Sequence, residues 1–234
     1  MSHPDVVTAL VRQRFAAVAN PDFVAPMAAY MKTKMPFWGI KKPERVPVYR
    51  ELKRDHAPRD HDEYVACVGA LWAMPHREEK YAAIEFAIAH RAFIGSASLP
   101  LYERMIREGA WWDLVDPLAA NAVGAVWLKE RSSTEVLMDR WIDDDDMWIR
   151  RTALIGQLRH KADLDRDRLF RYCRRRAHEK EFFIRKAIGW ALRDCSYSAP
   201  EAVQAFLQEH GDELSGLSRR EGSKHLVRSG LAAR

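Results

Sequence analysis

The chain has 234 residues, of which 47% are hydrophobic and 30% are charged, and its formal net charge is +5. The longest nearly apolar run, Val65 to Met74, is too short to span a bilayer, so the composition predicts a water-soluble protein with no membrane partner. Three scattered cysteines and nine histidines without ligand-like spacing predict neither a disulfide framework nor a zinc site. We expect no metal and no cofactor.

The first residues, Met1 to Val7, contain neither the basic region nor the apolar region of a secretory signal. Cytoplasmic residence is therefore the expectation.

Apolar residues recur with helical spacing along the chain. One stripe runs from Val7 to Val18 and another from Tyr81 to Ile88, and no stretch alternates as a strand does. Turn-forming residues separate the helical segments, at Asn20-Pro21, Gly39, Pro75, Ser96, Ser132-Ser133 and Ser198-Ala199-Pro200. The pattern predicts an all-α protein, and the lack of a Pro/Gly/Ser-rich linker predicts one domain over residues 1–234.

Three segments of the sequence align without gaps in their central parts. Each begins with an aromatic residue, Trp111, Trp148 or Phe183, and continues as an amphipathic helix, with separations of 37 and 35 residues. Helix pairs that recur at this period are typical of HEAT-like repeats. The sequence therefore predicts an α-solenoid that curves around a concave face.

Charge is uneven along the chain. Residues 148–193 hold fourteen Lys or Arg against five Asp or Glu, which indicates a polyanionic partner, although a solvated helical face gives the same pattern. The acidic run Asp143 to Asp146 precedes a helix expected near Met147, where carboxylates stabilise the positive end of the helix dipole. We interpret this run as capping and loop chemistry.

Four residues of the repeats are candidates for a site. Trp112, Arg151 and Trp190 are each 39 residues apart, and Asp116 follows Trp112 by four positions, on the same helix face. Together they offer an anion, a cation and two aromatic faces in one groove, which suits a positively charged nucleotide.

Each of these residues also has an ordinary structural interpretation. A Trp in a helical repeat usually fills the core, as we expect of Trp72, Trp127 and Trp141. Asp116 precedes Pro117 and so resembles a cap of an interrupted helix, and Arg151 resembles one of many surface cations.

Four motifs resemble the AlkD family of DNA alkylation repair glycosylases, over nearly the whole chain. They are Lys34–Arg45, Trp111–Asp116, Trp148–Arg151 and Phe182–Arg193. The resemblance implies a single domain of HEAT-like repeats around a concave DNA-binding cleft. It also implies excision of cationic alkylated purines, of the 3-methyladenine and 7-methylguanine types, from duplex DNA. The protein is then expected to be a monomer in the bacterial cytosol, associated with the nucleoid through DNA binding.

The resemblance also assigns roles to individual residues. Asp116 corresponds to the catalytic carboxylate, Trp112 and Trp190 to the aromatic residues around the deoxyribose of the lesion, and Arg151 to the cleft arginine beside the phosphate. A cationic base leaves without a general acid, so the carboxylate would stabilise the oxocarbenium-like sugar. The further expected DNA contacts are Phe182, Phe183, Lys41, Lys42, Arg150, Arg185 and Lys186.

Two other functions stay open at this point. One is a HEAT-like protein that binds damaged or distorted DNA without cutting the glycosidic bond. The other is a scaffold that binds protein partners on its concave face, which predicts an apolar or mixed groove.

Overall fold

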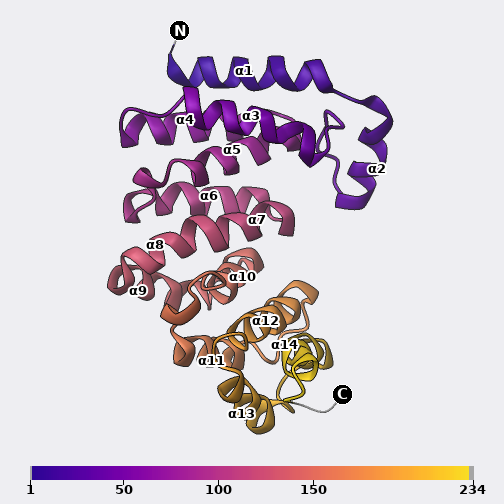
Figure 1. Ribbon diagram of the computed structural model, residues 1–234, viewed down its shortest axis with the longest axis vertical. Coiled ribbons are helices and arrows are strands. Elements are labelled where there is room, and N and C mark those ends of the chain that lie inside the picture. Colours follow the sequence, from indigo (N-terminus) through magenta and orange to yellow (C-terminus); the bar gives the residue numbers. More distant parts are fainter. Residues whose placement is uncertain (1, 232–234) are drawn as a thin grey trace. The chain divides into compact units, whose positions relative to one another are not determined.

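A computed structural model describes residues 2–231, and every regular element among them is a helix (Figure 1). This confirms the predicted all-α class. None of the described helices is both long and apolar enough to cross a membrane.

The chain divides into two compact units, Met1–Leu101 and Tyr102–Arg234. The first unit contains α1 (His3–Val18), α2 (Pro21–Met31), α3 (Lys42–Asp55), α4 (His61–Ala73), α5 (Arg77–Ala89) and the 3₁₀ turns η1 (Arg91–Phe93) and η2 (Ser96–Ser98). Helix α6 (Leu99–Gly109) begins at the boundary between the units. The prediction of a single domain over residues 1–234 stays a prediction.

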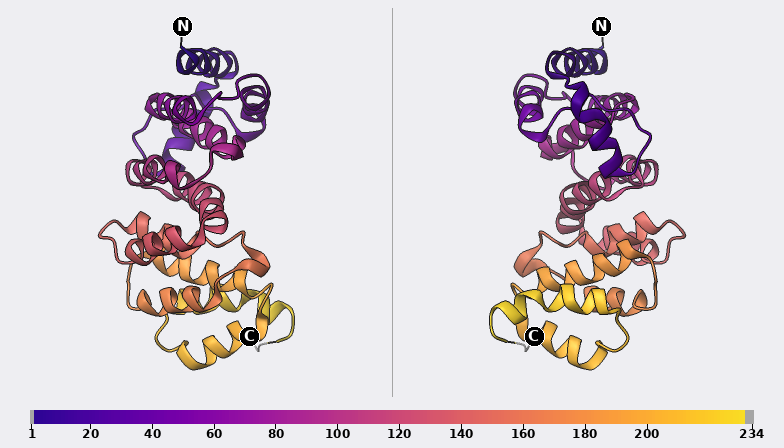
Figure 2. Two further views of the ribbon diagram at one scale, coloured as in Figure 1. Left: turned by 90° about the vertical axis from the view of Figure 1, so that its left-hand side faces the viewer. Right: turned by 90° about the vertical axis from the view of Figure 1, so that its right-hand side faces the viewer.

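The second unit carries the predicted repeats. It contains α7 (Trp112–Leu118), a π-helical turn η3 (Ala119–Val123), α8 (Gly124–Lys129), α9 (Arg131–Trp141), α10 (Met147–Ile155), η4 (Lys161–Asp163), α11 (Arg166–Arg175), α12 (Phe182–Cys195), α13 (Pro200–His210) and α14 (Gly216–Arg228). Figure 2 draws α11 to α14 in orange to yellow at the C-terminal end of the chain, where α14 packs mainly on α12.

The core of the first unit follows from the apolar stripes. In α1, Val7, Val11 and Phe15 are fully buried, and they recur at the spacing that places side chains on one face of a helix. Helix α1 packs on α3 and α4, and α4 packs in turn on α5.

In the second unit, α7, α10, α12 and α14 form a row in which each helix packs on the next. These are the helices that begin at the aligned aromatic positions, together with the last helix of the chain. Trp127 is fully buried, and Trp72 and Trp141 are 4% and 3% exposed, so the interpretation of these three as core residues is confirmed.

Helices α12 and α14 approach closely at Gly189. A Cβ atom added there would lie 2.4 Å from Cβ of Glu221 and 2.9 Å from the carbonyl oxygen of Ser218. Glu221 also pairs with Lys186 (2.8 Å) and Arg193 (2.6 Å) of α12, so the same crossing is held by charge. Because Gly189 directly precedes Trp190, this contact sets the register of Trp190.

We expect Gly189→Ala to lower the free energy of unfolding by about 1–3 kcal/mol, because the methyl group forces the two helices apart. Urea denaturation followed by circular dichroism measures the change. Gly216→Ala is the matched control, since its Cβ would meet only the end of the Arg220 side chain, at 3.3 Å. Equal stability of the two variants would contradict the close crossing.

Pro117 does not interrupt its helix, contrary to one interpretation of Asp116. It lies inside α7, and the chain continues through the π-helical turn η3 into α8. Asn121 donates from Nδ2 to the Pro117 carbonyl at 3.0 Å, within the turn that follows. Asp116 is therefore not a helix cap.

The acidic run before α10 is confirmed as capping and loop chemistry. Oδ1 of Asp146 accepts the N–H of Trp148 at 2.7 Å, which caps the helix that begins at Met147. Asp144 binds Arg107 (2.7 Å), and Asp143 pairs with Arg175 and Arg176 at the end of α11.

Candidate functional site

The structure brings Asp116 of α7 and Arg151 of α10 together in a two-pronged ion pair. Nε of Arg151 lies 2.7 Å from Oδ1 of Asp116, and Nη2 lies 2.8 Å from Oδ2. Such a fork fixes the plane of the carboxylate as well as its position. Arg151 is 3% exposed, which contradicts its interpretation as an ordinary surface cation.

A third bond anchors the arginine to the next helix in the row. Nη1 of Arg151 donates to the backbone carbonyl of Phe183, the second residue of α12, at 2.6 Å. Arg151 thus ties α7, α10 and α12 together and uses three of its five N–H groups. The other two N–H groups of Arg151 have no hydrogen-bond partner within the described chain.

The Phe183 carbonyl is held in place by an aromatic cluster. The Phe183 ring lies 4.9 Å from that of Trp148 and 5.3 Å from that of Trp111, and Trp111 and Trp148 are 6.0 Å apart. These three residues are the first aromatic residues of the aligned segments. The recurrence of an aromatic residue at this position of the repeat therefore has a packing cause, and Phe183 itself is largely a packing residue.

Asp116 retains access to solvent beside its partner. Its side chain is 13% exposed, and burial raises the pKa of its carboxyl group above the ordinary value, against the opposing effect of Arg151. Each carboxylate oxygen accepts one bond from Arg151 and keeps a second lone pair. A reacting group can therefore approach the carboxylate from the open side.

The predicted aromatic partners Trp112 and Trp190 are half-buried, on α7 and α12. Phe182, at the first position of α12, is 53% exposed and meets the Phe183 ring edge-on at 5.3 Å. All three rest on helices that the ion pair joins.

The predicted cationic DNA contacts fall into two groups. Arg150 binds both oxygens of Glu179, at 2.9 and 3.0 Å, as well as two backbone carbonyls of the acidic loop, and Lys186 pairs with Glu221. Both have internal partners that a phosphate would have to replace. Arg185 has no ion pair within the described chain, and its backbone carbonyl accepts the hydroxyl of Ser218 at 2.9 Å.

Lys41 and Lys42 belong to the first unit, where both are exposed. The ammonium group of Lys41 lies 3.6 Å from the centre of the Phe23 ring. The loop before them is anchored by the buried Glu78, whose carboxylate accepts the backbone N–H groups of Trp38, Gly39 and Ile40 at 2.9–3.0 Å. These hydrogen bonds fix the backbone that precedes both lysines.

Three parts of this region were not predicted from the sequence pattern. The first is Glu179, the partner of Arg150, and the second is the backbone carbonyl of Phe183, which anchors Arg151. A third, Asp194, follows Trp190 by one helical turn, and burial raises the pKa of its carboxyl group to about 6.

Asp194→Asn is expected to stabilise the protein by about 1–2 kcal/mol at pH 7, an amount reduced for the partial exposure of the group. Because folding raises this pKa from 3.8 to about 6, the cost to folding grows as the pH rises between these two values and is complete above pH 6. The cost disappears at lower pH, where the carboxyl group is protonated in both states. Chemical denaturation at pH 7 and pH 3 tests this. A gain that is equal at both values would contradict it.

Comparison with known proteins shows which family the chain resembles. The sequence model of the family described as "DNA alkylation repair enzyme" matches residues 11–226. A solved structure described as a predicted DNA alkylation repair enzyme from Enterococcus faecalis is similar, with a TM-score of 0.81 and 30% identity over 90% of this chain and 97% of that one. No curated protein matches.

The similar structure also confirms the predicted fold class of HEAT-like helical repeats. The family match covers most of the sequence, including all four residues of the predicted constellation. The chain therefore belongs to the family of DNA alkylation repair enzymes.

Proposed function

We propose that this protein is a DNA glycosylase that hydrolyses the N-glycosidic bond of cationic alkylated purines, of the 3-methyladenine and 7-methylguanine types, in duplex DNA. The observation that carries the proposal is the carboxylate of Asp116, fixed by Arg151 yet open on one side, in a member of a DNA alkylation repair family. A fixed carboxylate of this kind suits stabilisation of positive charge on a sugar.

The proposed reaction needs no acid. The alkylated purine carries a positive charge, so when the C1′–N bond breaks, the base takes the bonding electron pair and leaves as a neutral molecule. The sugar becomes an oxocarbenium-like cation, which the nearby carboxylate stabilises. Water then adds to C1′ and gives up a proton, which leaves an abasic site.

The other groups have supporting roles in this proposal. Trp112 and Trp190 offer aromatic faces to the cationic nucleotide, each contact contributing about 0.5–2 kcal/mol. Arg151 acts first as a positioning residue for Asp116, and its two remaining N–H groups suit a phosphate of the DNA backbone. Phe182, exposed at the beginning of α12, offers a further aromatic surface for contact with the DNA.

The expected partner is duplex DNA bound by a monomer. Arg185, Lys41 and Lys42 are the proposed phosphate contacts with the fewest internal partners. Affinity for undamaged duplex should then fall with salt, by about 0.9 log unit per phosphate contact for each tenfold increase.

The test is the release of free base from methylated duplex DNA by the purified protein. Chromatography of the small-molecule fraction should show 3-methyladenine and 7-methylguanine, with an equal number of abasic sites in the DNA. Binding of the methylated duplex without released base would overturn the glycosylase and favour a protein that recognises damage without excision.

A further inference from the structure

The segment between α11 and α12, residues 176–181, leads directly to the candidate site. Helix α12 begins with Phe182 and Phe183 after it. Lys180, Glu181 and Phe182 are all exposed, and the side chain of the N-cap residue Glu181 makes no capping hydrogen bond within the described chain. The first turn of α12 is therefore held by contacts on either side of these exposed residues and not by its own cap.

The contact before the exposed residues is a fork between Glu179 and Arg150 of α10. Nε of Arg150 lies 2.9 Å from Oε1 of Glu179, and Nη2 lies 3.0 Å from Oε2. Nη1 of Arg150 donates to the backbone carbonyls of Asp144 and Asp145, at 2.7 and 2.9 Å. Arg150 thus uses four of its five N–H groups within the protein, and its side chain is only 13% exposed. Glu179 is fixed on the beginning of α10 as a result.

The contact after the exposed residues is the bond from Nη1 of Arg151 to the carbonyl of Phe183, at 2.6 Å. Positions 179 and 183 are therefore held by two consecutive residues of α10. The aromatic cluster holds the Phe183 ring, and the direction in which the Phe183 carbonyl points also depends on how the chain enters α12. The pair of Glu179 and Arg150 fixes that entry.

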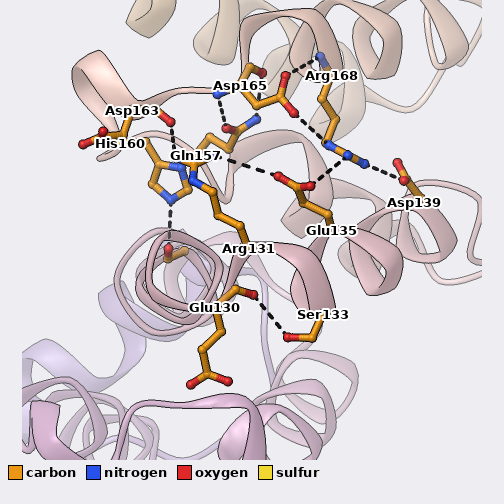
Figure 3. Close-up of polar contacts among 11 residues, drawn as sticks. Glu130, Arg131, Ser133, Glu135, Asp139, Gln157, His160, Asp163, Asp165 and Arg168 are labelled. Atoms are coloured by element: carbon orange, nitrogen blue, oxygen red, sulfur yellow. Dashed lines mark hydrogen bonds and ion pairs between the residues drawn. The ribbon is translucent and has the colours of Figure 1, made fainter.

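The chain reaches this segment from a helix that is itself fixed. Arg168 of α11 is held by three carboxylates (Figure 3), which are Asp165, Glu135 and Asp139. At the other end of α11, Arg176 pairs with Asp143 of the acidic loop and, at 3.4 Å, with Glu179. Because α11 is held at both ends, loss of the Glu179 carboxylate should act mainly on the entry to α12.

The arginine that anchors Phe183 also orients the proposed catalytic carboxylate. Arg151 binds Asp116 through Nε and Nη2 while its Nη1 is bound to the Phe183 carbonyl. A guanidinium group is planar and rigid, so a shift of the anchor at Nη1 turns the whole fork. Movement at the beginning of α12 therefore reaches Asp116 through one side chain.

We propose that Glu179 and Arg150 are positioning residues for the carboxylate of Asp116. Their ion pair fixes the entry to α12, the Phe183 carbonyl fixes Arg151, and Arg151 fixes the carboxylate. Arg150 then supports the site from within the protein, in place of the DNA contact expected from the sequence. The effect on excision rests on the proposed glycosylase activity, whereas the effect on the Asp116 carboxylate does not.

The direct test is the titration of Asp116 by NMR, in the full-length protein labelled with ¹³C at its aspartate carboxyl groups. The signal that is lost in Asp116→Asn identifies the residue. Burial and the charge of Asp113 raise the pKa of Asp116, and Arg151 opposes them. Glu179→Gln removes the fork to Arg150, so Arg151 should hold Asp116 less firmly and the pKa of Asp116 should rise further. An unchanged titration would overturn the proposal, whether or not the protein excises bases.

The kinetic test is single-turnover excision of 7-methylguanine. Glu179→Gln should lower the maximal rate by about 10–100-fold, with no change in the protein concentration that gives half of that rate. Arg150→Lys keeps the positive charge but cannot form the fork, so it should have the same effects on rate and titration. Weaker DNA binding by Arg150→Lys with an unaltered Asp116 titration would assign Arg150 to the DNA and overturn the proposal.

Glu135→Gln is the matched control. It also removes a carboxylate that pairs with a largely buried arginine of another helix, Arg168 at 3.2 Å, but it lies outside the segment that enters α12. It should leave the Asp116 titration and the excision rate unchanged. Equal effects of Glu135→Gln and Glu179→Gln would show a general loss of packing and contradict the positioning role.

Thermal melts followed by circular dichroism identify a temperature at which each variant is folded, and both tests are run there. If Glu179→Gln does not fold, Arg150→Lys serves for both measurements. If the unaltered protein releases no base, the proposed function fails, and the titration still decides whether Glu179 and Arg150 position Asp116.

Discussion

Asp116→Asn is expected to lower the rate of alkylbase excision by about 10²–10³-fold, because it removes the negative charge that stabilises the sugar cation. The amide keeps the size of the side chain and can still accept a hydrogen bond from Arg151, so the fold should survive. Single-turnover release of 7-methylguanine from methylated duplex measures the loss. Single-turnover conditions exclude slow product release from the rate.

The matched control is Asp145→Asn, which changes an exposed carboxylate of the loop before α10. It should excise at the unaltered rate. Binding of undamaged duplex by Asp116→Asn should be nearly unchanged, since the carboxylate makes no favourable contact with phosphate. If Asp116→Asn excises at a rate within a factor of about three of that of the unaltered protein, Asp116 is not the catalytic carboxylate.

Arg151→Ala is expected to cost about 3–5 kcal/mol of stability at neutral pH, because it leaves the carboxylate of Asp116 buried without its partner. The bond to the Phe183 carbonyl is lost as well, so the beginning of α12 loses its anchor. Denaturation by urea measures the difference, with Arg140→Ala as an exposed arginine control that should stay within about 0.5 kcal/mol.

The pH dependence of Arg151→Ala separates the ion pair from simple loss of packing. Burial already raises the pKa of Asp116, and removal of Arg151 raises that pKa further. As the pH falls, the carboxyl group becomes protonated and its burial costs less, so the stability gap between the variant and the unaltered protein should narrow. A stability difference that stays constant from pH 7 to pH 4 would show that the charge of Asp116 does not contribute to the destabilisation.

The raised pKa of Asp116 should also appear in the pH dependence of the excision rate. Excision needs the ionised carboxylate, so the rate should fall as the pH falls through a pKa above that of an ordinary aspartate. In Arg151→Ala, if enough folded protein remains at the assay temperature, this acidic limb should lie at higher pH. An acidic limb that does not move would contradict the positioning role of Arg151.

The sequence allowed much of the fold to be predicted, because helical periodicity and repeat length depend on local spacing. The second unit follows the predicted segments, and α10 begins at Met147 as the acidic run indicated. The turn placed at Ser132-Ser133 lies instead inside α9, which begins at Arg131. Pro117 was misleading because a π-helical turn accommodates the chain beyond it.

The pairing of Asp116 with Arg151 was only partly predictable. Their repeat positions placed both on one row of helices, but spacing alone gives no information on whether two opposite charges meet. The anchor of Arg151 is a backbone carbonyl, which any residue at position 183 would supply. Arg150 and Lys186 have the same charge as a DNA contact, yet the folded chain gives them Glu179 and Glu221 as partners.

The most direct test of the proposed chemistry compares a cationic lesion with a neutral one. Duplexes that carry a single 7-methylguanine or a single hypoxanthine would be incubated with the unaltered protein and with Asp116→Asn. If the substrate's own charge replaces acid catalysis, only the cationic base should be released, and Asp116→Asn should lose nearly all of that activity. Equal release of both bases, or undiminished release by the variant, would contradict the account.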